Sequence, residues 1–309
     1  MTWLDRQSFL GEASDDILAG LTVGLVGLGG GGSHLAQQLA HVGVGGFVLV
    51  DGDTISLTNL NRLIGGHFAD IRRNTRKVDI AERLIKGVNP RARIEKHFKE
   101  WQEAADSLKL CDAIISSVDS VRGKDELEGF SRRFLIPFID QGMDVHHLEE
   151  TGEYLVAGQV VLSGPGTPCL RCLGIVTEEA LEEEGRTYGD AGSKPQVVWP
   201  NGVLASTAVG LLMQLVTPWH RNPVDSACLE YDANLNTMLE SERFRRRAGK
   251  PCPHYDAKDL GDPTFDIRKL PQQVSAHAKP GKPAPAELRP LLILTRMFRW
   301  LGKHPNSRM

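Results

Sequence analysis

A run of glycines that follows a short apolar segment is the feature that most constrains this chain. Residues 22–27 are apolar and β-branched, which predicts a buried strand, and they lead directly into Gly27-Leu-Gly29-Gly30-Gly-Gly32. Glycines allow close backbone approach, and the free N–H groups of the following helix, expected to begin near Ser33, attract phosphate. The next apolar run, 47–50, ends in Asp51, about 20 residues beyond the glycines, where a carboxylate can accept hydrogen bonds from ribose hydroxyls. The segment predicts a nucleotide site in an α/β fold, and to this point NAD suits it as well as ATP.

Charged side chains further along the chain distinguish between these nucleotides. Hydride transfer needs no phosphate activation, whereas attack of a carboxylate on the α-phosphorus of ATP builds negative charge that arginine, lysine and Mg²⁺ stabilise. The loop after Asp51 leads to Arg62, Lys77 begins a helical run, and a buried-strand pattern over 111–119 ends in Asp119. These side chains follow strand ends, where open α/β sheets bind ligands. The pattern favours ATP, with Asp119 as the ligand of Mg²⁺.

The stretch from Asp51 to Arg62, Asp-Gly-Asp-Thr-Ile-Ser-Leu-Thr-Asn-Leu-Asn-Arg, resembles the motif of the ThiF/MoeB-like adenylyltransferases. This family includes the catalytic fold of ubiquitin-activating enzymes, and the resemblance extends more loosely from about Arg6 to Tyr255. It implies an α/β fold with a Rossmann-like, doubly wound, mostly parallel sheet and helices on both faces. It also implies that Arg6 reaches across a homodimer into the site of a second copy. By the same resemblance, Asp51 would bind the ribose, Asn59, Arg62 and Lys77 would contact the triphosphate, and Asp119 would bind Mg²⁺. The implied ATP site consists of the glycines of the turn and the polar residues that follow: Gly27, Gly29, Gly30, Gly32, Asp51, Asp53, Asn59, Arg62, Lys77 and Asp119.

The implied reaction is the adenylation of the C-terminal carboxylate of a ubiquitin-like or sulfur-carrier protein, with release of pyrophosphate. A downstream transfer enzyme would be a further partner, as in a bacterial ubiquitination-like pathway. Two other functions fit parts of the sequence. An NAD(P)-dependent oxidoreductase on the same fold is supported only by the glycines and Asp51, and a nucleotide-binding module without turnover is disfavoured because Arg6, Arg62, Lys77 and Asp119 are all present.

Three cysteines have the spacing of metal ligands. Cys169-Leu-Arg-Cys172 follows a proline- and glycine-rich turn, and Cys252-Pro-His254 lies in a second turn-rich stretch. Together they supply a Cys₃His set for a structural Zn²⁺ that ties the C-terminal segment to the fold. The family has two Cys-x-x-Cys pairs here, whereas this chain has Tyr255 at the fourth place, so either His254 substitutes or the fourth ligand lies elsewhere. The alternative is a set of free thiols.

The crossover loop expected over 173–200 contains no cysteine. Family members that carry their substrate as a thioester have a cysteine shortly before a helix start that corresponds to 201–204 here, and Val198 stands at the corresponding place. Cys111 and Cys228 lie in apolar strand patterns and are expected to be inert core thiols. Two interpretations of the reaction remain: it stops at the acyl-adenylate, or a hydroxyl of the loop such as Ser193 or Thr187 accepts the acyl group as an oxyester. The alternative for the loop itself is an ordinary surface loop without a chemical role.

Composition is consistent with an enzyme built on one core. The chain has 309 residues, is 41% hydrophobic and carries a net charge of −3, which gives no general attraction to nucleic acid. There is no signal-peptide pattern or apolar stretch of about 18 residues, and five unpatterned cysteines indicate a reducing compartment, so a cytoplasmic protein without a transmembrane segment is expected.

We expect the adenylation domain over 1–256 and a Pro-rich linker over 257–290. A short amphipathic helix is expected over 291–309, and it either docks a partner enzyme, the dimer mate or an anionic membrane surface, or packs on its own domain.

Overall fold

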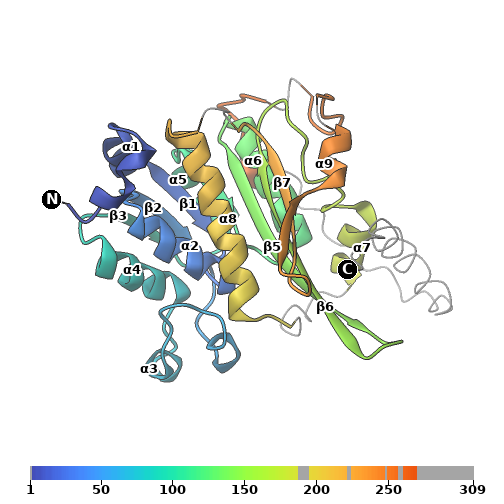
Figure 1. Cartoon of the computed structure of the whole chain (residues 1–309), viewed down its shortest axis with the longest axis horizontal. Helices are drawn as coiled ribbons and strands as arrows, with labels where there is room; N and C mark the ends of the chain where they lie inside the picture. The colour runs from blue at the N-terminus through green and yellow to red at the C-terminus, as the bar shows by residue number, and fades with distance from the viewer. Residues whose placement is uncertain (1, 187–194, 221–223, 248, 257–259, 270–309) are drawn as a thin grey trace, which may run out of the picture. The chain divides into compact units, whose positions relative to one another are not determined.

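One eight-stranded sheet organises the protein (Figure 1). The computed structural model describes residues 2–186, 195–220, 224–247, 249–256 and 260–269. The strands follow the order β3-β2-β1-β4-β5-β6-β7-β8; β1 to β5 pair in parallel, and β5 to β8 pair antiparallel. Their bounds are β1 Thr22–Val26, β2 Gly46–Val50, β3 Arg93–His97, β4 Ala113–Ser116, β5 Phe138–Leu148, β6 Glu153–Ser163, β7 Ala227–Asp232 and β8 Thr237–Glu240.

Helices cover both faces of this sheet, as expected for a doubly wound fold. α2, α4 and α8 lie on one face, and α5 and α6 lie on the other (Figure 1). The α-helices are α1 Ser14–Gly20, α2 Gly30–His41, α3 Phe68–Arg72, α4 Lys77–Val88, α5 Ala105–Leu108, α6 Val121–Arg133, α7 Glu178–Arg186, α8 Val198–Val216 and α9 Glu242–Arg247. Short 3-10 helices are η1 Asp5–Leu10, η2 Leu57–Asn59, η3 Trp101–Ala104 and η6 Ile267–Lys269.

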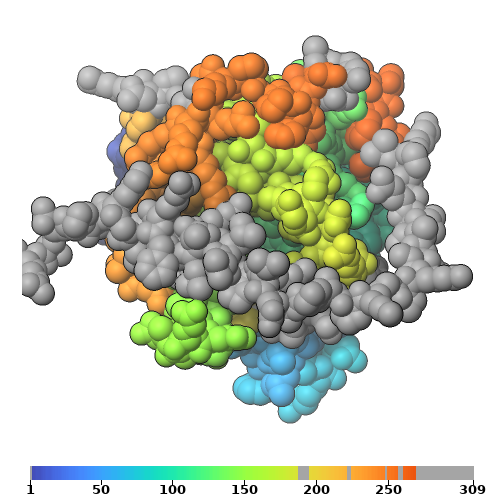
Figure 2. Space-filling view, turned by 90° about the vertical axis from the view of Figure 1, so that its right-hand side faces the viewer, coloured from blue at the N-terminus to red at the C-terminus, as the bar shows by residue number. Residues whose placement is uncertain are grey.

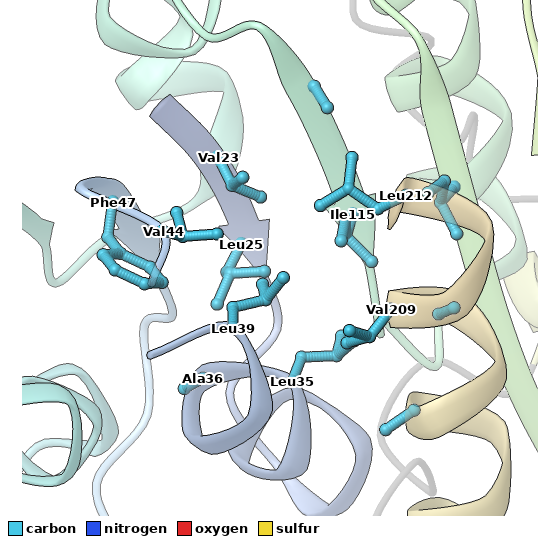
Figure 3. Close-up of a cluster of buried hydrophobic side chains, with 14 of the residues drawn as sticks. Val23, Leu25, Leu35, Ala36, Leu39, Val44, Phe47, Ile115, Val209 and Leu212 are labelled. Carbon is cyan, nitrogen blue, oxygen red and sulfur yellow. The ribbon is translucent and has the colours of Figure 1, made fainter. Parts of the chain in front are cut away.

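The alternation of side chains along each strand divides the core into two layers. Val23 and Leu25 of β1 join Leu35 and Leu39 of α2 and Val209 of α8 in one layer (Figure 3). Val48 and Val50 of β2 point to the other face, where they pack in the layer that contains Leu127 and Phe130 of α6. Because these strands are buried on both faces, their sequences are continuous apolar runs and do not alternate between apolar and polar residues.

Helix α8 begins earlier than its apolar sequence suggests. Residues 203–216 have the apolar pattern, but the helix starts at Val198 and includes Pro200 in its first turn, where a missing N–H costs nothing. The early start brings Asn201 to the carboxyl ends of the central strands. The segment 173–200 contains helix α7, and Thr187 and Ser193 lie outside the described residues.

The compact unit extends past the expected boundary at 256. Ile267 is buried in the layer that contains α6, and the ring of Phe265 packs against Phe134 with centroids 6.3 Å apart. Contacts divide the chain near residue 270, so the described segment 260–269 belongs to the main unit. The rest of the expected linker and the helix over 291–309 lie outside the described residues. Of the helices that the structure describes, none has the length and hydropathy of a membrane span.

The connection between β2 and α4 is held by a partly buried ion pair of Asp70 and Arg83, which gives a stability prediction. Asp70 is 3% exposed and accepts hydrogen bonds from both terminal nitrogens of Arg83, at 2.9 and 2.7 Å. The hydrogen bonds from Arg83 lower the pKa of Asp70 from 3.8 to about 2. We expect Asp70→Asn to lower the free energy of unfolding by about 1–2 kcal/mol at neutral pH, since Arg83 is half-exposed and partly screened.

The pH dependence of this loss follows from the lowered pKa. A carboxyl with a lowered pKa stabilises the fold above its ordinary pKa, and this contribution disappears as the pH falls through about 2. Urea unfolding at pH 7 and near pH 2.5 is expected to show the two proteins converging at the lower pH. Asp79→Asn, which removes one acceptor of the exposed Lys96, is the control, with an expected change under about 0.5 kcal/mol. An equal loss at both pH values would contradict the assignment.

Candidate functional site

The glycine turn after β1 packs so tightly that side chains are excluded at two places. Gly27 has φ +83°, and a Cβ there would lie 2.6 Å from the carbonyl oxygen of Ser117. A Cβ on Gly32 would overlap the Gly27 carbonyl. Gly29, by contrast, has open space on its surface and precedes α2 directly. Gly30 and Gly31, the first residues of this 12-residue helix, line the cleft beside the turn, and free N–H groups at a helix start favour an anion.

A cleft opens beside this turn, between β1 and β4. The order β2-β1-β4 places the reversal of chain direction there, which is where open α/β sheets bind ligands. The cleft encloses roughly 500 Å³ of empty space, part of it open to solvent. It is lined by Gly29, Gly30, Gly31, Asn59, Arg62, Lys77, Ser117, Asp119, Gln141, Gly142, Met143, Gln196, Asn201 and Leu204. The cations and the carboxylate singled out from the sequence thus meet at the glycine turn.

Asp51 and Asp53 hold the ammonium of Lys77. Asp51 follows β2, and its carboxylate accepts from the N–H of Leu28 at 2.7 Å, which ties it to the glycine turn. The Lys77 Nζ, at the start of α4, lies 2.6 Å from Asp53 Oδ2 and 3.6 Å from Asp51 Oδ1. Burial raises the pKa of the Asp51 carboxyl above its ordinary value, against the attraction of Lys77. Lys77 is therefore neutralised by protein carboxylates in this structure.

The turn that follows β2 presents Asn59 and Arg62 to the cleft. Asn59 Oδ1 accepts from the N–H of Ser56 at 3.0 Å and closes a capping box around η2. Arg62 Nη1 donates to the carbonyl of Thr58 at 2.7 Å and to Asn61 Oδ1 at 3.0 Å. These local bonds fix the turn, and both side chains line the cleft.

Asp119 lies just past the end of β4 and meets the segment that enters α8. Its Oδ1 accepts a hydrogen bond from Gln196 Nε2 at 3.1 Å, and the Gln196 carbonyl in turn accepts from Asn61 Nδ2 at 2.8 Å. Carboxylate oxygens are the ligands that Mg²⁺ prefers. Asp119 therefore fits the predicted metal role, and Gln196 links it to the turn of Arg62.

Several lining residues were not predicted as part of the site. Ser117, Gln141, Met143, Gln196 and Leu204 reach the cleft, and Asn201, noted only as a helix start, donates to the Val197 carbonyl at 2.8 Å beside Gly30. Ser117 could have been predicted as a site residue from the sequence, because it lies near the carboxyl end of a predicted strand. The others depend on the pairing of β5 with β4 and on the packing of α8 against α2, which the sequence does not state.

Arg6 does not line the cleft of its own chain. It is exposed in η1, and the neighbouring Gln7 anchors that turn by donating to the Val42 carbonyl at 3.0 Å. Its predicted role requires a second copy of the chain.

The cysteines Cys169, Cys172 and Cys252 converge with His254 into one cluster. His254 Nδ1 lies 3.3 Å from Cys169 Sγ and 3.4 Å from Cys172 Sγ, and the Sγ atoms of Cys172 and Cys252 are 3.7 Å apart. The edges of a tetrahedral zinc site with Zn–S bonds near 2.3 Å and Zn–N bonds near 2.0 Å are about 3.5–3.8 Å. Burial, Arg171 and Arg247 lower the pKa of His254, which favours the neutral ring that a metal needs. The four residues therefore fit a tetrahedral metal site, with His254 in the fourth place.

Side chains of helix α6 contact the segments that carry this cluster. Glu128 Oε2 accepts from the N–H of Leu170 at 3.0 Å, and Arg132 donates to the Thr167 carbonyl at 3.2 Å. The Arg132 guanidinium also lies over the ring of Tyr255, 4.8 Å from its centroid. In Figure 2 the yellow-green segment around α7 lies beside the orange segment that includes α9, which shows how two distant parts of the chain meet here.

The remaining two cysteines are core thiols. Cys111 and Cys228 are 5% and 2% exposed, and burial raises the pKa of each to about 12. All five cysteines are described, and none of them lines the cleft. A thiolate nucleophile is therefore not present there.

Comparison with known proteins identifies the family of this chain. A profile of the ThiF family matches residues 4–253. The ubiquitin-like modifier-activating enzyme 5 of Xenopus laevis is 27% identical over 258 residues, 77% of this chain and 58% of that protein. The molybdopterin-synthase adenylyltransferase of Haemophilus influenzae is 33% identical over 117 residues, 37% of this chain and 47% of that protein. The chain thus spans about half of the length of these relatives.

Solved structures show the same fold. E. coli MccB with ATP superposes with a TM-score of 0.61 at 20% identity, covering 78% of this chain and 71% of that one. The family profile covers most of the chain, including the glycine turn, the cleft residues and the turn of Cys169 and Cys172. The protein belongs to the ThiF family.

Proposed function

We propose that this protein uses ATP and Mg²⁺ to adenylate the C-terminal carboxylate of a ubiquitin-like or sulfur-carrier protein. The observation that carries the proposal is the convergence of Arg62, Lys77 and Asp119 on one cleft at the glycine turn. The names of the relatives, an activating enzyme and an adenylyltransferase, support the same chemistry. An oxidoreductase would have little use for this set of charges, since hydride transfer needs no phosphate activation.

The reaction forms one bond and breaks one. A carboxylate oxygen of the carrier attacks the α-phosphorus of ATP, and the bond from that phosphorus to the pyrophosphate oxygen breaks, so that acyl-adenylate and pyrophosphate result. Asp51 accepts hydrogen bonds from the ribose hydroxyls, and the N–H groups at the start of α2 face the phosphates. Arg62 and Lys77 stabilise the charge that develops on the phosphate oxygens.

Lys77 has to change its partners for this step. Its ammonium contacts Asp53 at 2.6 Å, and ATP phosphates would replace that carboxylate. Asp119 is the residue that would hold Mg²⁺, since its carboxylate lines the cleft and is bonded by the neutral Gln196 amide. When bound, Mg²⁺ supplies positive charge to the phosphates.

The Cys₃His cluster would hold a structural Zn²⁺. Its four ligand atoms lie within 4.8 Å of one another. Its residues join the turn of Cys169 and Cys172, after β6, to the segment of Cys252 and His254, after α9. We also propose a homodimer, in which Arg6 of a second copy completes the site, because Arg6 does not reach the cleft of its own chain.

The acyl-adenylate is the expected end product on this chain. The cleft contains no cysteine, so an external sulfur, amine or partner enzyme would attack the adenylate. An oxyester on Ser193, which lies outside the described residues, is the alternative.

The test is Mg²⁺-dependent exchange of pyrophosphate into ATP with candidate carrier proteins, with intact mass measured after quenching. Exchange with unchanged enzyme mass is the expected result. A mass increase that resists thiols but yields to hydroxylamine would indicate an oxyester, and a complete lack of exchange would contradict adenylation.

A further inference from the structure

The side chain of Gln141 is buried in the wall of the cleft, yet it is not used by the steps described above. Strand β5 pairs with β4 up to Asp140 opposite Ser116, where β4 ends. Gln141 is the next residue of β5, so it is the first one to pass beyond β4 into the crevice at the strand ends. It is 3% exposed and lines the cleft.

The amide of Gln141 is only partly hydrogen-bonded. Its Nε2 donates to Ser117 Oγ at 3.3 Å, and a Cβ on Gly31 would collide with that nitrogen, so the amide lies against the glycine turn. Its Oε1 is buried and has no hydrogen-bond partner among the described residues. A buried acceptor without a partner costs about 1–3 kcal/mol, and such groups in native proteins call for an explanation.

The surroundings of this oxygen differ from those of the phosphate-binding residues. Arg62, Lys77 and Asp119 give one part of the lining its charge. Besides Gly142, β5 and α8 contribute two carboxamides and two apolar side chains, which carry no charge: Gln141, Met143, Asn201 and Leu204. A triphosphate has no hydrogen-bond donor at neutral pH, so a phosphate cannot satisfy Oε1. The donors of ATP are its ribose hydroxyls and its adenine amino group, which belong to the end of the nucleotide assigned to Asp51. Asp51 follows β2, and β1 and β4 separate β2 from β5, the strand of Gln141. The missing donor therefore belongs to the other substrate.

We propose that Gln141 Oε1 accepts a hydrogen bond from the amide N–H of the terminal residue of the acyl substrate. This inference rests on the proposed adenylation. It assigns the substrate class as an N-acylated α-amino acid, R–CO–NH–CHR–COO⁻, which includes every peptide or protein C-terminus. A simple carboxylic acid, or an ester in place of that amide, leaves Oε1 buried and unpaired.

A pair of adenylate analogues tests this without the natural carrier. N-acetylglycyl-sulfamoyladenosine carries the N–H, and acetoxyacetyl-sulfamoyladenosine has an ester oxygen in its place. Isothermal titration is expected to show that the unmodified protein binds the amide about 10- to 100-fold more tightly than the ester, the effect of one buried acceptor left unpaired. In Gln141→Leu the two affinities are expected to agree within about threefold.

Two further variants control for altered packing. Gln159→Leu makes the same change on the neighbouring strand, opposite Gly142, and is expected to keep the preference for the amide. Gln141→Glu retains an acceptor oxygen of the same reach and is also expected to keep the preference. If the leucine variant does not fold, Gln141→Met replaces it, since methionine has a similar length and no strong acceptor, and the two affinities are again expected to agree.

The outcomes separate the two proposals. Equal binding of both analogues to the unmodified protein, or the same preference in Gln141→Leu, would overturn the role of Gln141 and leave adenylation standing. Binding of neither analogue, together with an absence of pyrophosphate exchange, would overturn both.

Discussion

Asp119→Asn is expected to reduce the Mg²⁺-dependent exchange of pyrophosphate into ATP by about 10²- to 10³-fold, because it removes the charge that would hold the metal at the phosphates. The variant keeps an oxygen that can accept from Gln196, so the link to the turn of Arg62 is expected to survive. The exchange rate at saturating ATP and carrier measures the effect.

Asp112→Asn is a matched control for this experiment. Asp112 precedes β4 and accepts from the N–H of Thr22 at 2.8 Å, so it stands at the opposite end of the same strand from Asp119. It is expected to leave the exchange rate within about twofold, as for surface substitutions away from the site. Undiminished exchange in Asp119→Asn, with both variants folded, would remove Asp119 from the site.

Replacement of Cys172 by serine is expected to have the largest effect on stability. Structural zinc sites contribute their binding free energy to folding, so loss of a ligand is expected to cost several kcal/mol. For a unit of this size, about 3 kcal/mol corresponds to a fall of roughly 6–12 °C in melting temperature. Metal content by mass spectrometry and melting with and without a chelator measure both consequences.

The control for this experiment is Cys228→Ala. Cys228 is buried in the core and is not one of the four clustered residues, so its loss is expected to leave the metal content unchanged and to cost about 1 kcal/mol. Exchange activity per folded molecule of Cys172→Ser is expected to stay near that of the unmodified protein. An unchanged metal content and melting temperature in Cys172→Ser would show that the four residues do not hold a metal.

Much of the fold and of the charged part of the site could be predicted from local sequence. The apolar runs that became β1 and β2 are buried on both faces, which makes them readable without tertiary information. The glycine turn, Asp51, Arg62, Lys77 and Asp119 follow strand ends, and a parallel sheet brings such ends to one edge.

The remainder of the site depends on contacts between distant segments. Gln141 joins the cleft because β5 pairs with β4 and continues beyond it, and Asn201 joins because α8 starts before its apolar run. The fourth place of the metal cluster was open in sequence because Tyr255 interrupts the second Cys-x-x-Cys pair, and only the folded chain brings His254 Nδ1 to two sulfurs. The ion pair of Lys77 with Asp53 was also hidden, since both residues were expected to face the nucleotide.

That ion pair gives the cleft an internal counter-ion. A nucleotide that reaches Lys77 displaces the carboxylate of Asp53, 71% of whose side chain is exposed, and this carboxylate can then return to water. Binding there exchanges one protein-held anion for another, so it releases fewer salt ions from solution than the cations of the cleft suggest. The affinity for the nucleotide would accordingly depend less on ionic strength. It would depend more on how well the phosphates fit the position beside Lys77 that the Asp53 carboxylate occupies.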